Sequence, residues 1–465
     1  MLRKIEGHVV FTICELSRKI RERKISPVEL THECLTRIDK LNPVLNAFIT
    51  VTAESALERA RLAEREIYRG HYLGPLHGIP IGIKDIIDTA DVRTTAASEQ
   101  FKDRVPTEDA EVVHRLRAGG AIILGKQNLH EFAYGGSSMV SHFGEVHNPW
   151  DTTRIAGGSS GGSAASVAAG LGFAAVGTDT AGSVRLPAAY CGVVGAKPTY
   201  GRVSARGVIP LSTSYDHVGS ITHTVYDAAL MMQVMTGQQS ADPCAEPSFI
   251  SAFDEFSPNL RIGIPRPFFF DDLDPEIAAA TENAIEVFRK LNAEIREIKL
   301  DVPIDRTLAS AEAYAYHKIF VEHSPELYQP ATLARIKSGA AISPDDALRA
   351  RRELDAARES IRQIFDEVDV LLTPTVPIPP PKIGDLREHP EDLRPRELIM
   401  LRNTRPFNVW GTPAISIPCG FTAAGLPIGL QLAAAPRHGI MLLQAAQAYE
   451  QATSWHQQMP SLVNS

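Results

Sequence analysis

Up to about residue 70, apolar residues recur at the three- and four-residue spacing of one helix face. The clearest set is Leu30, Cys34, Leu35, Ile38 and Leu41. Residues 26–29, Ser-Pro-Val-Glu, have the pattern of a capped helix start with proline at the first helical position. We expect Asn42-Pro43 to stop this helix and a second helix to run from about residue 53 to the glycine at 70. Region 1–70 is therefore predicted to be helical.

From about residue 78 the pattern changes to short apolar runs that alternate with helical stretches. The runs that predict strands are 79–83, 121–124, 172–176, 192–194, 260–264 and 370–374. Helices are expected near 109–116, after Gly161-Gly162, from Asp274-Pro275, and over most of 306–367. The polar segment 237–257 is expected to be a surface connection. Strands alternating with helices predict an α/β fold with parallel strands in the middle of its sheet.

Composition excludes several classes of protein. The chain is 44% hydrophobic and 22% charged, which is ordinary for a globular protein. Its net charge is −8, and its basic residues are scattered along the sequence. A nucleic-acid surface would need a concentrated basic patch, so none is expected. The 5 cysteines form no C-x-x-C pair, which argues against a disulfide framework or a structural zinc and favours a reducing cytoplasm. No signal peptide or membrane-spanning stretch is expected.

Candidate chemistry gathers in two serine-bearing, glycine-rich segments, residues 157–164 (GGSSGGSA) and 177–185 (GTDTAGSVR). A third segment, residues 78–85 (GIPIGIKD), places a lysine at the end of an apolar run. The first segment lacks the lysine of a phosphate-binding P-loop and the spacing of a dinucleotide fingerprint. Alone it could be a tight turn. Together the three segments supply two hydroxyls, one amine and unshielded backbone N–H groups, which are the components of acyl transfer without histidine.

Ser183 lies among small residues that leave its hydroxyl uncovered, and the N–H groups of Thr180, Ala181, Gly182 and Ser183 could converge on an oxyanion. Serine needs a base to accept its proton. Lys84 is the candidate, because burial among its apolar neighbours would lower its pKa and favour the neutral amine. The alternative is that Lys84 reaches the surface or forms an ion pair with the neighbouring Asp85.

The three segments, in this order, resemble the amidase signature family of serine hydrolases. Further matching segments are 148–151, 191–192, 197–199, 201–204, 216–219, 411–420 and 425–431. The resemblance covers most of residues 25–450 and is weakest between about 240 and 365. It implies an α/β amidase-signature fold, with a central mixed sheet, largely parallel middle strands and helices on both faces. We expect one large domain, 1–465, made of the helical region 1–70, a catalytic core 71–240 and a more divergent half 241–465.

The resemblance also implies roles for individual residues. Ser183 would be the nucleophile, Ser159 a bridging serine in a cis peptide, and Lys84 the base. Ala133 and Tyr134 match positions that line the family's substrate channel, although Tyr134 could equally serve packing. No metal or other cofactor is expected.

Several neighbouring residues have two interpretations at this stage. Asp179 and Arg185 are expected to form an internal ion pair that shapes the Ser183 loop; the alternative is that Arg185 binds a substrate carboxylate. Ser160 and Ser163 are expected to hydrogen-bond at a helix N-terminus. A set of aromatic residues in the divergent half either shapes an apolar pocket or packs in the core: Tyr314, Tyr316, His317, Phe320, Phe407 and Trp410.

The resemblance leads to two expectations about function. The first is a stand-alone cytoplasmic amidohydrolase that cleaves the C–N bond of a small linear amide, with esters or carbamates as further substrates. It would act without nucleic-acid or membrane partners, and a homodimer is one option for its oligomeric state. The alternative is the glutaminase component of a tRNA-dependent amidotransferase, its A subunit. That component is expected to carry an S-S-N-L-S-R-[FY]-D-G stretch, which is absent around residues 309–314. A scaffold without catalysis is disfavoured because both serines and the lysine are present.

Overall fold

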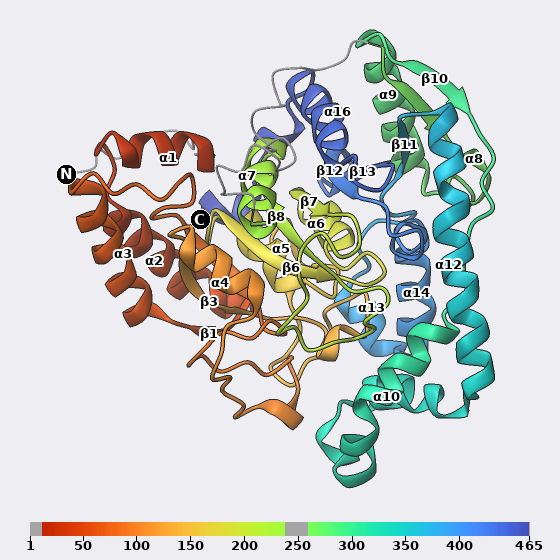
Figure 1. The fold of residues 1–465 in the computed structure, drawn as a ribbon, viewed down its shortest axis with the longest axis horizontal. Helices are drawn as coiled ribbons and strands as arrows, with labels where there is room; N and C mark the ends of the chain where they lie inside the picture. Colours follow the sequence, from red (N-terminus) through yellow and green to blue (C-terminus); the bar gives the residue numbers. More distant parts are fainter. Residues whose placement is uncertain (1–11, 238–258, 465) are drawn as a thin grey trace.

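An 11-stranded mixed sheet forms the framework of the protein in a computed structural model that describes residues 12–237 and 259–464 (Figure 1). In sheet order its strands are β1 (Phe48–Val51), β3 (Ile122–Gln127), β2 (Pro80–Lys84), β6 (Ala174–Asp179), β8 (His217–Thr222), β7 (Val194–Lys197), β12 (Ala414–Phe421), β13 (Pro427–Ala434), β11 (Val370–Pro374), β9 (Arg261–Ile264) and β10 (Glu294–Glu297). Strands β4 (His147–Asn148) and β5 (Asp151–Ile155) form a separate two-stranded ribbon. The expected α/β fold with a mixed central sheet is confirmed.

The parallel strands lie in the two flanks of the sheet rather than in its middle. Strand β2 pairs in parallel with β3 and β6, and β9 pairs in parallel with β10 and β11. Between these flanks, β6, β8, β7, β12, β13 and β11 pair antiparallel. No helix lies between β7 and β8 or between β12 and β13, and strands joined without a crossover helix return antiparallel. The short apolar runs predicted β2, β3, β6, β9, β11 and the start of β7, but not β8, β10, β12 or β13. The expectation of parallel strands in the middle of the sheet differs from these antiparallel pairings.

The larger helices follow the order of the sequence. They are α1 (Ile13–Arg21), α2 (Pro27–Leu45), α3 (Ala53–Tyr68), α4 (Glu111–Ala118), α5 (Gly161–Ala168), α6 (Arg185–Cys191), α7 (Val225–Met235), α9 (Pro275–Lys290), α10 (Thr307–His323), α11 (Pro330–Ser338), α12 (Pro344–Glu367), α14 (Leu393–Met400) and α16 (Gly439–Gln451). The short helices α8 (Arg266–Phe269), α13 (Ile383–Glu388) and α15 (Pro406–Val409) complete the set. The predicted surface connection 237–257 lies almost wholly outside the described residues.

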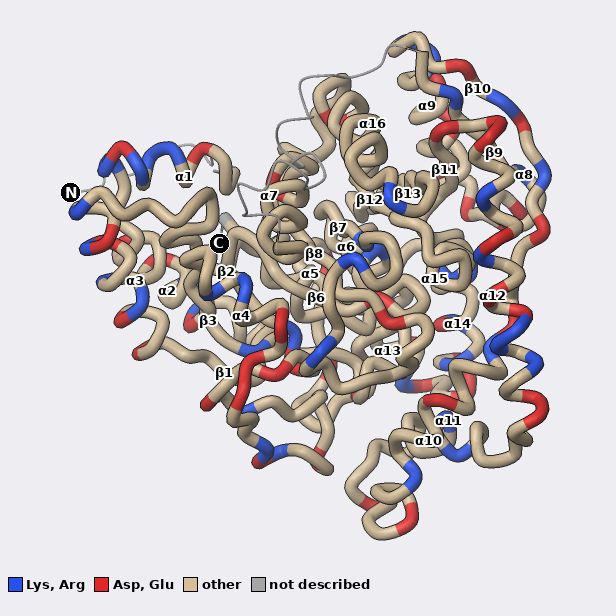
Figure 2. The backbone as a smooth tube through the Cα atoms, viewed as in Figure 1, with Lys and Arg blue, Asp and Glu red and all other residues tan. Residues whose placement is uncertain are grey.

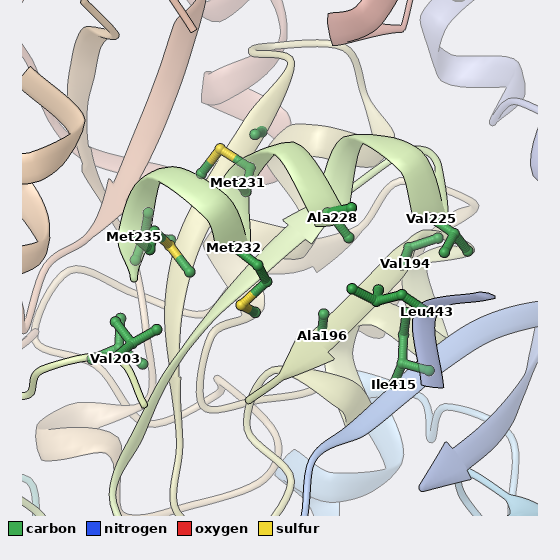
Figure 3. Packing of buried hydrophobic residues seen from close by; sticks show 14 of the residues in the cluster. Val194, Ala196, Val203, Val225, Ala228, Met231, Met232, Met235, Ile415 and Leu443 are labelled. Atoms are coloured by element: carbon green, nitrogen blue, oxygen red, sulfur yellow. The ribbon is translucent and has the colours of Figure 1, made fainter. Parts of the chain in front are cut away.

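Helices cover both faces of the sheet, as expected. Alternate strand residues face opposite sides, so Ile122 and Leu124 of β3 join the core beneath α2, α3 and α5, whereas Ile123 joins the core beneath α4, α7 and α16. Figure 3 shows the core beneath α4, α7 and α16, in which Met231, Met232 and other residues of α7 lie above β7 and β12. Because both faces are covered, every residue of β2, β3, β6, β7 and β8 is buried, including the polar residues of β8.

The N-terminal region differs from the prediction in two places. Helix α2 begins at the predicted cap, where the Ser26 hydroxyl accepts hydrogen bonds from the N–H groups of Val28 and Glu29. It does not stop at Asn42-Pro43 but continues to Leu45. A proline in the last turn removes only one hydrogen bond, so the helix ends where Asn46 adopts a left-handed conformation with φ of 51°. Strand β1, which pairs antiparallel with β3 at the sheet edge, was not predicted within this helical region.

Charged residues of both signs are interspersed along the surface helices (Figure 2). Helix α12, for example, carries Asp345 and Asp346 in its first turn, and arginine and glutamate side chains recur along its exposed length. Within the described residues no helix is long and apolar enough to cross a membrane.

Phe288 offers a test of the core that anchors α9 to the sheet. Its side chain is fully buried, and its ring stacks on Tyr449 of α16 at 5.3 Å between ring centroids. Phe288→Ala should lower the free energy of unfolding by about 3–5 kcal/mol, because it removes buried apolar area and leaves a cavity. Urea denaturation followed by circular dichroism measures this. The control Ile319→Ala, at a side chain that is 67% exposed, should change stability by less than about 0.5 kcal/mol; equal effects would contradict this description of the core.

Candidate active site

The amine of Lys84 is buried at the end of β2 and lies beside two hydroxyls. Every residue of this strand is buried, since β3 and β6 flank it and helices cover both faces. The Lys84 Nζ lies 2.7 Å from the Ser159 Oγ and 2.7 Å from the Thr178 Oγ1. Burial lowers the pKa of Lys84 to about 7, although the carboxylates of Asp179 and Asp216 oppose this shift. An amine with this pKa is present in its neutral form near pH 7.

The alternative of a Lys84–Asp85 ion pair is not what the structure shows. The Asp85 carboxyl lies 3.7 Å from the amine of Lys126 and accepts hydrogen bonds from the N–H and hydroxyl groups of Thr95. Lys126 in turn donates to the carbonyl of Ile87 and to the Thr94 hydroxyl. Successive strand residues point to opposite faces, so the lysine and the aspartate belong to separate networks.

Ser159 lies in the loop that precedes α5. The Gly158–Ser159 peptide bond is cis, as the resemblance implied. The carbonyl of Ser159 accepts hydrogen bonds from the N–H of His130 and from the Ser138 hydroxyl, which also accepts from the N–H of Gly161. These contacts hold the buried Ser159 hydroxyl toward Lys84.

Ser183 lies in the turn between β6 and α6 and is 4% exposed. Its carbonyl accepts a hydrogen bond from the N–H of Ser160, which ties the two glycine-rich loops together. Gly182 has a φ of +130°, and a Cβ there would lie 2.0 Å from the Thr404 Oγ1, so only glycine fits this position. The Ser183 hydroxyl makes no hydrogen bond within residues 12–237 and 259–464, and it lines a pocket.

One of the four N–H groups expected to hold an oxyanion has another partner. The N–H of Gly182 donates to the Asp179 Oδ1 at 2.8 Å. In the described part of the chain, the N–H groups of Thr180, Ala181 and Ser183 have no acceptor. These three donors are therefore the ones available to a ligand oxygen beside Ser183.

Asp179 and Arg185 form the expected internal ion pair. Both side chains are fully buried, and the guanidinium contacts the carboxylate at 2.9 and 3.0 Å. The other Arg185 donors reach Gln431 and Asn408, each at 2.6 Å. Beside this guanidinium the pKa of Asp179 is held well below its usual range despite burial. Arg185 does not line the pocket, so the alternative that it binds a substrate carboxylate is not supported.

Asp216 joins the Ser183 loop to the next strand. Its carboxylate accepts a hydrogen bond from the Thr180 hydroxyl at 2.6 Å and from the N–H groups of Leu211 and Ser212, each at 3.0 Å. Burial raises the pKa of Asp216 to about 6, and hydrogen bonds limit the shift. The negative charge of Asp216 favours the charged form of Lys84, so it partly offsets the lowering of the lysine pKa by burial.

A pocket of about 670 Å³ opens onto Ser183. Its lining comes from five parts of the chain: Ala133, Tyr134 and Gly135; Thr180, Ala181 and Ser183; Leu211 and Tyr215; Asp305, Arg306, Ala309 and Ser310; and Arg394, Leu401, Arg405 and Val409. Ala133 and Tyr134, which the resemblance assigns to the family's substrate channel, are among these lining residues. Thr180 and Ala181 also line the pocket, whereas Gly182 is not among the lining residues.

The aromatic residues of the divergent half lie away from this lining. The six are Tyr314, Tyr316, His317, Phe320, Phe407 and Trp410. His317 is buried against Phe132 and Tyr328, and Phe407 packs against Trp410 and Phe269. Their environment is therefore core packing, the alternative considered for them. The residues that α10 contributes to the pocket lining are the small residues Ala309 and Ser310.

Some site residues were not predicted or were predicted differently. Thr178, whose hydroxyl contacts the Lys84 amine, belongs to the second glycine-rich segment, but the sequence pattern indicated no role for it. Ser138 follows the glycines at 135 and 136 in a small-residue loop, which was its only signal. Ser160 was expected to cap α5, but its hydroxyl donates to the carbonyl of Thr178 at 3.2 Å, and the buried Ser163 hydroxyl has no partner in the described residues. Among these residues no group of three or more His, Cys, Asp or Glu side chains could hold a metal ion.

Comparison with known proteins places this geometry in a family. The sequence pattern of the Amidase family matches residues 29–443. The A subunit of glutamyl-tRNA(Gln) amidotransferase from Geotalea daltonii is 39% identical over 484 residues, which covers 97% of this chain and 99% of that protein.

Two solved structures extend the comparison. The 6-aminohexanoate cyclic dimer hydrolase superposes with a TM-score of 0.89 at 30% identity, over 99% of this chain and 100% of that chain. The A subunit of the glutamyl-tRNA(Gln) amidotransferase from Thermotoga maritima superposes with a TM-score of 0.77 at 31% identity, over 96% and 95%. The chain therefore belongs to the amidase signature family of enzymes.

Proposed function

We propose that the protein hydrolyses an amide through an acyl-enzyme on Ser183, with Ser159 and Lys84 as the proton relay. The observation that carries this proposal is the position of the Lys84 amine, 2.7 Å from the Ser159 hydroxyl in a buried site that favours its neutral form. Ester or carbamate cleavage would follow the same route. We also propose that the described elements act as a single domain, since residues from both halves line the pocket.

The proposed reaction begins when neutral Lys84 accepts the proton of Ser159, which accepts the proton of Ser183. The Ser183 Oγ forms a bond to the substrate carbonyl carbon, and the negative charge on the carbonyl oxygen is stabilised by the N–H groups of Thr180, Ala181 and Ser183. The relay returns the proton to the leaving nitrogen as the C–N bond breaks. Water then attacks the ester, releasing the acid and restoring Ser183.

Sequence similarity favours the amidotransferase component, the alternative of the two expected functions. The relatives with this function match nearly their full length at 39% identity. In that case the substrate is glutamine, the chain acts with partner proteins, and its reaction is linked to tRNA. The expectation of no nucleic-acid partner would then be wrong.

Two observations favour a stand-alone amidase as the second candidate. The hydrolase of a cyclic dimer superposes more closely than the amidotransferase component, with TM-scores of 0.89 and 0.77. The chain also lacks the S-S-N-L-S-R-[FY]-D-G stretch around residues 309–314, where it was expected. Helix α10 occupies this place and contributes Ala309 and Ser310 to the pocket lining.

Replacement of the relay residues should abolish turnover. We expect Ser183→Ala to lower kcat by about 10⁴-fold or more, and Lys84→Ala by about 10³-fold or more, because the nucleophile or its base is lost. Circular dichroism and melting temperature should show that both variants fold. Ser360→Ala, at an exposed serine of α12, is the matched control. Mass spectrometry should find an acyl adduct on Ser183; near-normal activity of Lys84→Ala at neutral pH would contradict the relay.

The pH profile reports which group is the base. Because neutral Lys84 is the active form and its pKa lies at about 7, kcat/KM should rise about tenfold per pH unit below pH 7 and level off above it. The Asp216 carboxylate favours the charged lysine, so Asp216→Asn should move this rise to lower pH without removing it. A kcat/KM profile that is flat between pH 5.5 and 8.5 would exclude Lys84 as the base. A rise that disappears in Asp216→Asn would show that another group causes it.

The isolated chain separates the two candidates. Since the lysine, both serines and the pocket come from one chain, we expect the purified protein to release amine from small amides without a partner. Ammonia release from glutamine and amine release from a simple anilide are measured with the chain alone, then with co-purified partners and tRNA. Activity that appears only with partners and tRNA would establish the amidotransferase function instead.

A further inference from the structure

Three arginine side chains line the pocket that contains Ser183. Arg306 begins α10, Arg394 lies in α14, and Arg405 lies just before α15. They come from segments about 90 residues apart in the sequence, and only the fold brings them to one cavity. A second, more open hollow next to the pocket shares Tyr134, Asp305, Arg306, Ser310 and Arg394 with it. Two of the three guanidinium groups therefore lie where the two hollows meet.

The protein supplies little negative charge to balance them. Within the described residues, the Arg405 side chain has no hydrogen bond and no ion pair. Arg394 lies 3.6 Å from the carboxylate of Glu397, which already pairs with Arg335 at 2.8 Å. The charges of Arg306 and Arg394 act against the charged form of Arg405, and an anion between them would offset this repulsion.

Among the described residues, the pocket lining has one acidic residue, whose single negative charge offsets only one of the three arginines. Asp305 lines the pocket, but its two carboxylate oxygens accept hydrogen bonds from the N–H and the hydroxyl of Thr307 at 2.8 and 2.9 Å. Burial, followed by the charges of Arg306 and Arg394, lowers the pKa of Arg405 to about 10, so it remains a cation at neutral pH. The pocket thus holds more positive than negative charge.

Structural arginines in the same region look different. Arg185 is fully buried, and its guanidinium contacts Asp179, Gln431 and Asn408. Arg335 contacts Glu397 and the carbonyl of Tyr134. These two side chains have the protein partners that arginines with a packing role require. Arg405 has none within the described residues, although it is more than half buried at the pocket wall.

We propose that Arg306, Arg394 and Arg405 form a carboxylate-binding subsite, so that the amide substrate carries a negatively charged group in addition to the bond that Ser183 attacks. A guanidinium presents paired N–H donors that match the two oxygens of a carboxylate, and partial desolvation in the pocket strengthens that contact. The inference rests on the proposed amide hydrolysis and names its substrate class. Glutamine is one member of this class, and other carboxylate-bearing amides are further members.

Two pairs of substrates that differ in charge but little in shape test this subsite. Glutaramate and neutral glutaramide place the difference on the acyl side, whereas N-acetyl-β-alanine and neutral N-propylacetamide place it on the amine side. In at least one pair, kcat/KM should be about 10- to 100-fold higher for the carboxylate member. Arg405→Gln and Arg394→Gln should each narrow that ratio by at least about fivefold, mainly through KM. The control Arg396→Gln, at an exposed residue of the same helix that lines neither hollow, should leave the ratio as it is.

A binding measurement separates this inference from the proposed reaction. Calorimetry with the Ser183→Ala variant gives the Kd of glutaramate and of glutaramide without turnover, and we expect tighter binding of glutaramate that weakens in the Ser183→Ala, Arg405→Gln double variant. Carboxylate-selective binding without turnover of any amide would contradict the proposed reaction but support the subsite. Turnover with no charge preference in either pair, or ratios that change no more than in the Arg396 control, would overturn the subsite alone.

Discussion

The site depends on one constraint, the burial of the Lys84 amine without a carboxylate in contact. A carboxylate beside it would hold the proton on the amine, whereas the Ser159 and Thr178 hydroxyls satisfy its hydrogen bonds without adding charge. The sheet makes this possible, because Lys84 ends a strand that has neighbouring strands on both sides and is covered on both faces. The neighbouring Asp85 is directed to a separate pair with Lys126. Burial therefore acts on the pKa of one lysine while the nearby charges are paired elsewhere.

A second carboxylate, Asp179, organises the loop that carries the nucleophile. It accepts hydrogen bonds from the N–H groups of Gly182 and Val184 and pairs with Arg185, so the turn around Ser183 is held from inside the protein. Breaking one partner of such a buried pair typically costs about 3–5 kcal/mol, which explains why the pair can define the shape of a loop. The same arrangement uses the N–H of Gly182 and leaves those of its neighbours for a ligand.

The two halves of the chain have different tasks. The lysine, the serines and the loop that holds them come from residues before 220, which also carry most of the segments that match the family. The outer wall of the pocket comes from 305–310 and 394–409, where the resemblance is weaker. The residues proposed for catalysis and the outer wall of the pocket thus come from different parts of the chain. Three of the wall residues are arginines, Arg306, Arg394 and Arg405.

The sequence by itself determined the family and the catalytic candidates, and it predicted helices such as α2, α3, α4, α5 and α9 and the strands β2, β3, β6, β9 and β11. Ser183, Ser159 and Lys84 lie in local motifs, and caps such as Ser26 act within a few residues of the helix they start. The tertiary structure alone decided strand direction, the partners of Lys84, and which side chains reach the pocket. The sequence assigned no role to Thr178, and for the aromatic residues of the divergent half it left both core packing, the more common fate, and the pocket open. Arg306, Arg394 and Arg405 are distant in sequence, and contacts at such separations depend on the packing of the whole sheet and its helices.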